Sequence, residues 1–205
     1  MNTDKTDNLA EDLRQKDLCF LDVETTGSQI GYHEIIEVAA IRTAPDASRI
    51  LNTWRKRIRP CYPERISAYA KELTGFDPAL WREAEISNPP LWKQFVNFVH
   101  DCVPVCHNPS FDRAFVSLAA GQHGIVDLGL DYHWIGTESL AWPLYLSGRI
   151  KMPSLEGICD AFHIAVEPLP HTALDGARAC LLVYKALVAY CTVENLPIDI
   201  TCLKK

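Results

Sequence analysis

Two acidic residues separated by a single residue are the first candidates for chemistry in this chain. Asp22 and Glu24 stand at the end of the apolar run 18–23 and directly before Thr25-Thr26-Gly27. Residues i and i+2 of a β-strand point to the same face, so the two carboxylates would project together. Burying two like charges side by side is costly unless a cation offsets them. The pair therefore predicts either a site for a hard cation such as Mg²⁺ or Mn²⁺, or two exposed acids at a strand end.

A third carboxylate follows a second apolar run. Asp112 closes the segment Asn108-Pro-Ser-Phe-Asp112, which comes directly after the run 103–106. The segment predicts the first turn of a helix, where Asn108 can serve as a cap and an acid is favoured by the helix dipole. Asp112 is therefore either a helix-start acid or a further carboxylate at the same edge of the sheet.

A histidine lies on a stiff loop in the last third of the chain. His171 follows Pro168-Leu-Pro170 and precedes a long apolar stretch. Histidine can act as a general base near neutral pH, although a loop histidine can also be an ordinary surface residue. Together the three features fit phosphodiester hydrolysis, in which two metal ions about 4 Å apart activate a water and stabilise the leaving oxygen. The histidine would accept the proton of that water.

The three segments resemble, in order and spacing, the three motifs of the DEDDh exonucleases, the superfamily of the bacterial proofreading subunit, RNase T and oligoribonuclease. The segments are Asp22-Val-Glu24-Thr-Thr-Gly, Asn108-Pro-Ser-Phe-Asp112 and His171-Thr-Ala-Leu-Asp-Gly. The resemblance covers nearly the whole chain. It implies a ribonuclease H-like fold, two Mg²⁺ or Mn²⁺ ions, and release of nucleoside 5′-monophosphates from a single-stranded 3′ end of DNA or RNA.

The resemblance also implies roles for individual residues. Asp22, Glu24 and Asp112 would bind the metals directly or through water, and His171 would be the general base. The main-chain amides near Thr25 and Thr26 would hold the terminal nucleotide. The substrate-binding candidates come from the first two motifs: Thr25, Thr26, Asn108 and Phe111.

The third motif departs from the family pattern. The family has H-x-A-x-x-D, whereas here the last position is Gly176 and the acid stands one residue earlier, at Asp175. One residue of a helix corresponds to a rotation of about 100°, so Asp175 cannot simply replace the missing side chain. Near a helix start the backbone is less constrained, and Asp175 is a hypothesised metal ligand from a different direction. The alternatives are weaker metal binding with water at that place, or an inactive exonuclease fold that only binds nucleic acid.

The elements that must position these residues follow the pattern of an α/β domain. Strands are expected over 18–23, 34–43 and 50–59 as an antiparallel meander, and further strands over 103–106 and 132–137. Helices are expected over 63–73, 89–99, 110–121, 138–146, 154–162 and 172–191. The prediction is a ribonuclease H-like mixed five-stranded sheet flanked by helices. The exonuclease domain would cover 18–192, between a polar N-terminal arm (1–17) and a C-terminal tail (193–205).

Composition limits the class of protein. The chain has 205 residues, of which 48% are hydrophobic and 22% charged, as expected of a single globular domain. The net charge of −6 argues against a long non-specific nucleic-acid groove, but not against a nuclease that grips only a strand end.

The remaining sequence signals concern location and partners. No apolar run approaches the roughly 18 residues that span a membrane, and the N-terminus lacks a secretory signal. Eight scattered cysteines without a C-x-x-C pair fit reduced thiols, so a cytoplasmic location is expected. The preference for DNA or RNA, a homodimer and an association with a polymerase are left open by the sequence.

Overall fold

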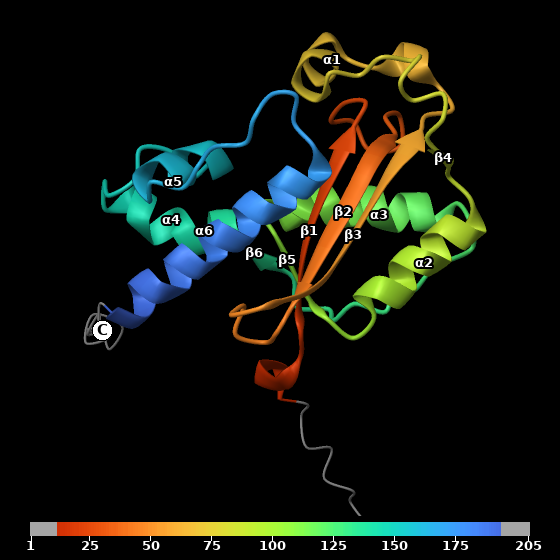
Figure 1. The fold of residues 1–205 in the computed structure, drawn as a ribbon. Coiled ribbons are helices and arrows are strands. Elements are labelled where there is room, and N and C mark those ends of the chain that lie inside the picture. Colours follow the sequence, from red (N-terminus) through yellow and green to blue (C-terminus); the bar gives the residue numbers. More distant parts are fainter. Residues whose placement is uncertain (1–11, 194–205) are drawn as a thin grey trace, which may run out of the picture.

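A mixed β-sheet forms the centre of the computed structural model, which describes residues 12–193 (Figure 1). Within those residues six strands are arranged in the order β4-β3-β2-β1-β5-β6. The strands are β1 (Leu18–Thr25), β2 (Ile35–Thr43), β3 (Ile50–Arg59), β4 (Glu85–Ile86), β5 (Val103–Cys106) and β6 (Ile135–Gly136). The first three form the predicted antiparallel meander, and β5 runs parallel to β1.

Helices cover both faces of this sheet (Figure 1). The α-helices are α1 (Ala68–Thr74), α2 (Pro89–Val99), α3 (Pro109–Gly121), α4 (Thr137–Leu146), α5 (Leu155–Ala161) and α6 (Ala173–Val193). Two short 3₁₀ helices are η1 (Leu13–Gln15) and η2 (Pro63–Arg65). The long helix α6 crosses one face of the sheet, while α2 and α3 lie on the other face. None of the described helices is long and apolar enough to cross a bilayer.

The prediction of a ribonuclease H-like α/β fold is confirmed, but the strand count was wrong. Five strands were expected, and the described chain has a sixth, β4, which pairs in parallel with β3 over two exposed residues. Such a short edge strand has too few residues to show alternation in the sequence. The expected strand 132–137 is likewise reduced to the two residues of β6.

The predicted helix 63–73 is divided by Ser67. Ser67 has an extended backbone, and its hydroxyl accepts a hydrogen bond from the Ala70 amide, which caps the start of α1. The segment therefore forms η2 and then α1, and α1 ends at Gly75 with φ of 63°. Of the predicted N-terminal arm and C-terminal tail, residues 1–11 and 194–205 lie outside the described residues.

Strand β1 connects the core to the predicted site. Leu21 and Val23 face the apolar cluster of α2 and α3, whereas Phe20 on the other face packs against Ala177 and Cys180 of α6. Full burial of a side chain such as that of Phe20 contributes roughly 2–3 kcal/mol. This alternation continues along the strand, so the acidic residues that follow lie on the α6 face, where α6 begins.

Candidate active site

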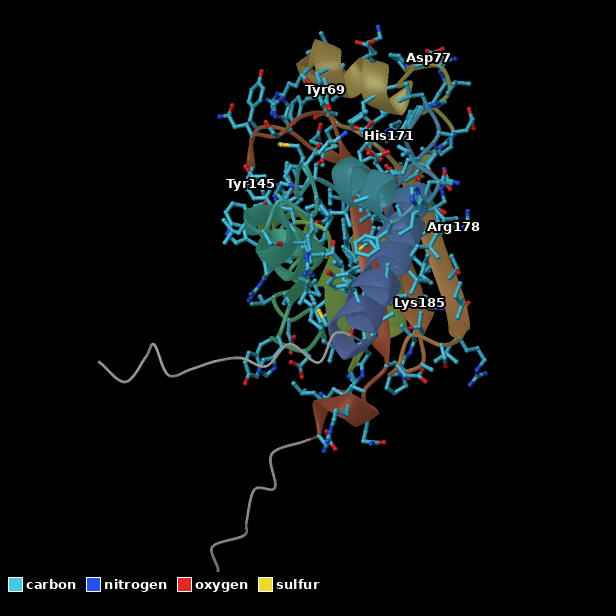
Figure 2. The ribbon with its side chains drawn as sticks, turned by 90° about the vertical axis from the view of Figure 1, so that its left-hand side faces the viewer. Tyr69, Asp77, Tyr145, His171, Arg178 and Lys185 are labelled. Carbon is cyan, nitrogen blue, oxygen red and sulfur yellow. The ribbon has the colours of Figure 1, made fainter. Side chains whose placement is uncertain are left out.

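Residues of all three predicted motifs meet at a pocket beside the C-terminal end of β1. The pocket has a volume of about 450 Å³, and its lining includes Asp22, Glu24, Phe111 and His171. Helix α1 forms the opposite wall with Tyr69, Leu73 and other residues. Figure 2 shows His171 between α1, which carries Tyr69, and the first turns of α6. The His171 amide donates to the Leu73 carbonyl over 2.8 Å, which anchors the loop before α6 to α1.

Asp22 and Glu24 project from β1 on one face, as the i, i+2 spacing predicts. Both are partly buried, and burial is the largest cause that raises the pKa of each carboxyl. The negative charge of Asp112, Glu24 and Glu167 raises the pKa of Asp22 further. The pKa of Glu24 reaches about 8 for the same kind of reason. In the metal-free chain these carboxylates therefore repel one another.

Asp112 lies in the first turn of α3 and is 3% exposed. Burial raises its pKa to about 7, although hydrogen bonds from its own amide, the Val23 amide and the Cys106 thiol act in the opposite direction. Its Oδ1 atom is buried without a hydrogen-bond partner. A buried carboxylate oxygen without a partner is costly, and a bound cation is one group that would satisfy it.

The neighbouring carboxylate of Glu37, in contrast, is paired with basic side chains of the protein itself. Glu37 is the cross-strand partner of Glu24 and is 2% exposed. It accepts two hydrogen bonds from Arg55, at 2.8 and 3.0 Å, and one from Arg57 at 3.2 Å. Among the described residues, no lysine or arginine forms such a pair with Asp22, Glu24 or Asp112.

Glu167 is a third acidic residue in the lining of this pocket, and it was not predicted from the sequence. It lies on the loop between α5 and α6 and lines the pocket with Asp22 and Glu24. Its Oε1 atom is buried without a hydrogen-bond partner, and burial raises its pKa to about 7. The three motifs do not include Glu167, because this residue precedes the third motif. The signal available was an acid four residues before the motif histidine.

His171 is held by this same carboxylate. Its Nδ1 atom lies 3.2 Å from Oε2 of Glu167. Burial lowers the pKa of His171 below its usual value, while Glu156 and Asp175 act in the opposite direction. A neutral ring that donates from Nδ1 to Glu167 has a free lone pair on Nε2, which is the form a general base requires.

The structure places Asp175 and Gly176 on different sides of the first turn of α6. Oδ2 of Asp175 accepts a hydrogen bond of 2.7 Å from the Thr172 hydroxyl, and Oδ1 lies 3.2 Å from Arg178. Gly176 instead faces the acidic residues: a Cβ atom there would lie 2.5 Å from Oδ2 of Asp22. Asp175 and Gly176 thus face different sides of α6, as expected for consecutive residues of a helix, which are rotated by about 100°.

The substrate-binding candidates are divided between the pocket and its surroundings. Thr25 and Phe111 line the pocket, and the Phe111 ring packs on Phe115 with centroids 4.8 Å apart. Thr26 is fully buried, and its amide donates to the Glu34 carbonyl over 2.9 Å, so that amide is already engaged. Asn108 is exposed outside the pocket lining, and its side chain accepts from Ser110.

The donor chemistry fits hard divalent cations. Several carboxylates lie together, two of their buried oxygens lack partners, and their charges raise one another's pKa values. Mg²⁺ and Mn²⁺ prefer oxygen ligands of this kind. No three His, Cys, Asp or Glu side chains of residues 12–193 already converge on one point as a finished metal site would.

The fold and this acidic pocket define the class of exonuclease domains with a ribonuclease H-like sheet. The family model described as an exonuclease of the RNase T type matches residues 19–184. The chain belongs to the RNase T exonuclease family.

Curated relatives are similar over most of this chain but are much longer. The chain is 30% identical over 186 residues to the PolC-type DNA polymerase III of Thermotoga maritima, covering 88% of this chain and 13% of the relative. It is 33% identical over 146 residues to that of Streptococcus sanguinis, covering 71% and 9%. The chain thus spans about a tenth of the length of the curated relatives it matches.

Solved structures share the fold. The E. coli exonuclease I complex with a dT13 oligonucleotide has a TM-score of 0.70 at 17% identity, covering 84% of this chain and 41% of that one. The nuclease domain of 3′hExo, a DEDDh family member bound to rAMP, has a TM-score of 0.67 at 16% identity, covering 86% and 93%. At such low identity the likeness concerns the fold.

Proposed function

We propose that this chain is a metal-dependent 3′–5′ exonuclease that releases nucleoside 5′-monophosphates from single-stranded ends of DNA or RNA. The observation that carries the proposal is the grouping of Asp22, Glu24 and Asp112 beside the pocket that contains His171, with no lysine or arginine of residues 12–193 paired to them. Membership of an exonuclease family supports the same reaction. Relatives of the fold hold a DNA oligonucleotide in one case and rAMP in another, so both polymers stay in the proposal.

The metal ions would be held by the carboxylates of β1 and α3. Asp22, Glu24 and Asp112 are the proposed ligands, directly or through water. Two Mg²⁺ or Mn²⁺ ions would supply a more acidic attacking water and charge stabilisation for the leaving 3′ oxygen. The ligands must be ionised to serve, and their raised pKa values make cation binding compete with protons near neutral pH.

His171 is the proposed general base. Its lowered pKa keeps the ring neutral at pH 7, and Glu167 holds Nδ1, so that Nε2 can accept a proton. The water oxygen would attack the terminal phosphorus while the bond to the 3′ oxygen of the preceding nucleotide breaks. Phe111 and Thr25, on the wall of the pocket, would orient the terminal nucleotide.

The test is a degradation assay with 5′-labelled single-stranded DNA and RNA in Mg²⁺ or Mn²⁺. Stepwise shortening of the labelled strand, with mononucleotide release and loss of activity in Asp22→Asn, is the expected result. A 3′-labelled strand should lose its label in the first step. Absence of shortening with both metals would contradict the proposal.

A second candidate is a nucleic-acid-binding domain with an inactive exonuclease fold. Gly176 favours it, because the family acid is missing from that position. This candidate predicts retained binding of single-stranded ends without any shortening in either metal, which the same assay combined with a binding measurement distinguishes. A polymerase is the partner to test by co-purification, since the curated relatives are polymerases.

A further inference from the structure

We propose that Glu167, from the loop before α6, supplies the fourth metal-binding carboxylate that Gly176 lacks. The inference rests on the proposed exonuclease function and specifies the ligand set of its metal site. In this assignment the acid comes from a loop residue nine positions before Gly176 and not from helix α6. Four observations lead to it.

The first observation is the space beside Gly176. A Cβ atom at this position would lie 2.5 Å from Oδ2 of Asp22 and 2.9 Å from Oε1 of Glu167. Real Cβ atoms essentially never approach so closely, so an aspartate here would require the side-chain ends of Asp22 and Glu167 to shift. The carboxylate of Glu167 therefore lies directly beside the position of an added side chain at residue 176.

The second observation is that one oxygen of Glu167 is unused. Oε2 faces Nδ1 of His171 at 3.2 Å, but Oε1 is buried without a hydrogen-bond partner and lies on the Asp22 side. Only 12% of the Glu167 side chain is exposed. A buried, unpaired carboxylate oxygen next to another carboxylate is unfavourable unless a cation or a proton lies between them.

The third observation is that Asp112, which is 97% buried, also has an unpaired oxygen and a charge that acts on Asp22. Acidic side chains that each have an unpaired oxygen thus act on Asp22 from two elements, α3 and the loop before α6. Together with Glu24 they amount to four acids, the number that the family motif provides when its last position is an aspartate.

The fourth observation is that Asp175 has another role. The Asp175 carboxylate accepts a hydrogen bond from the Thr172 hydroxyl. The Thr172 hydroxyl in turn accepts a hydrogen bond of 3.2 Å from the Asp175 amide. The two residues thus form a reciprocal cap at the start of α6. The second carboxylate oxygen of Asp175 faces Arg178 on the outer side of the helix. Figure 2 shows Arg178 on α6, below His171 in this view. Asp175 would have to break these contacts to bind a metal.

The loop that carries Glu167 is fixed by its neighbours. The His171 amide donates to Leu73 of α1, and Pro170 packs against Gly75, where an added Cβ would lie 2.9 Å from the proline ring. Pro168 and Pro170 further limit the backbone between Glu167 and His171. The loop thus presents the proposed ligand and the proposed base together, as two ends of one rigid segment.

The experiment measures Mn²⁺ affinity directly, by calorimetry or by the electron paramagnetic resonance of free Mn²⁺, in the absence of nucleic acid. Glu167→Gln keeps the size of the side chain and is expected to weaken the affinity at least tenfold. Asp175→Asn is the matched control and should stay within twofold of the wild type. His171→Ala removes the histidine that Glu167 contacts, and its Mn²⁺ affinity should also stay within twofold of the wild type. An unchanged affinity in this variant, with a weakened one in Glu167→Gln, indicates that Glu167 binds the metal and does not only position the base.

A swap of positions completes the test. Glu167→Ala should weaken Mn²⁺ binding, and Glu167→Ala combined with Gly176→Asp should restore it to within threefold of the wild type. Gly176→Asp alone should not improve binding, because the Glu167 carboxylate already lies directly beside this position. Circular dichroism confirms that each variant is folded.

The outcomes separate two kinds of failure. If the wild type binds Mn²⁺ but Glu167→Gln does not weaken it, or Asp175→Asn weakens it instead, the assignment of Glu167 is wrong while the proposed function stands. If the wild type binds no Mn²⁺, the metal site itself is refuted, and the assignment with it.

Discussion

Replacing Glu24 by glutamine should stabilise the metal-free protein while it removes a proposed metal ligand. The reason is the raised pKa of Glu24, about 8, which reflects burial and the charges of Glu167, Glu37 and Asp112. A group whose pKa is raised on folding contributes its stability below its unfolded pKa and loses it as pH rises through the folded value. Ionised Glu24 therefore destabilises the folded chain increasingly between about pH 4.3 and pH 8.

The size of the effect follows from that pKa. At 1.36 kcal/mol per pKa unit, the upper limit for ionising Glu24 in the folded chain is roughly 5 kcal/mol. Partial exposure and proton sharing with Asp22 and Glu167 reduce it, so Glu24→Gln should gain about 1–3 kcal/mol at pH 8.5. The gain should shrink toward pH 5, where much of the penalty is absent.

Urea unfolding of EDTA-treated protein at pH 5 and pH 8.5 measures this difference. Glu37→Gln is the matched control on the neighbouring strand, because Glu37 is paired with Arg55 and Arg57. Losing those hydrogen bonds should destabilise the chain by roughly 2 kcal/mol, so the two glutamine variants should have effects of opposite sign. At a Mn²⁺ concentration 100 times its dissociation constant, the wild type should gain about 2.7 kcal/mol and Glu24→Gln much less.

The reasoning is refuted if Glu24→Gln destabilises the metal-free chain at pH 8.5. It is also refuted if the gain does not grow between pH 5 and pH 8.5. Either result would mean that the carboxylates beside β1 do not repel one another in the folded chain.

Three further predictions follow from the site. Asp175→Ala should cost about 1 kcal/mol in the free energy of unfolding, because it removes one of the two hydrogen bonds of the reciprocal cap between Thr172 and Asp175; an unchanged urea midpoint would contradict this role. His171→Ala should lower kcat by about 10²–10⁴-fold with Mn²⁺ affinity retained, as steady-state kinetics and a metal titration will determine. Phe111→Ala should raise KM about tenfold on oligonucleotides if the ring stacks on a base, and an unchanged KM would restrict Phe111 to packing on Phe115.

Much of this fold could be predicted from the sequence. The apolar runs of β1, β2 and β5 are bounded by turns and acids, and their burial confirms that pattern. Strand β3 alternates only in part, and most of its side chains are exposed. The two-residue strands β4 and β6 were missed or overextended, because they are too short to carry a periodic signal. Ser67 divided a predicted helix because its hydroxyl competes for the Ala70 amide.

The site was predictable only where side-chain direction follows from local spacing. Asp22 and Glu24 on one strand face, and Asp112 at a helix start, lie where that reasoning puts them. Thr26 was proposed as an amide donor, but its amide is engaged by Glu34, which depends on strand pairing across a turn. Glu167 was missed, because its approach to Asp22 depends on how a proline-containing loop packs against α1.

The proposed function requires that the carboxylates around β1 hold divalent metal beside a base that can accept a proton. The most direct measurement is a crystal structure of the chain soaked with Mn²⁺ and a nucleoside 5′-monophosphate, with anomalous data to locate the metal. The account predicts Mn²⁺ between Asp22, Glu24, Asp112 and Glu167, with the phosphate facing His171. A bound nucleotide with no anomalous density at these carboxylates would contradict it.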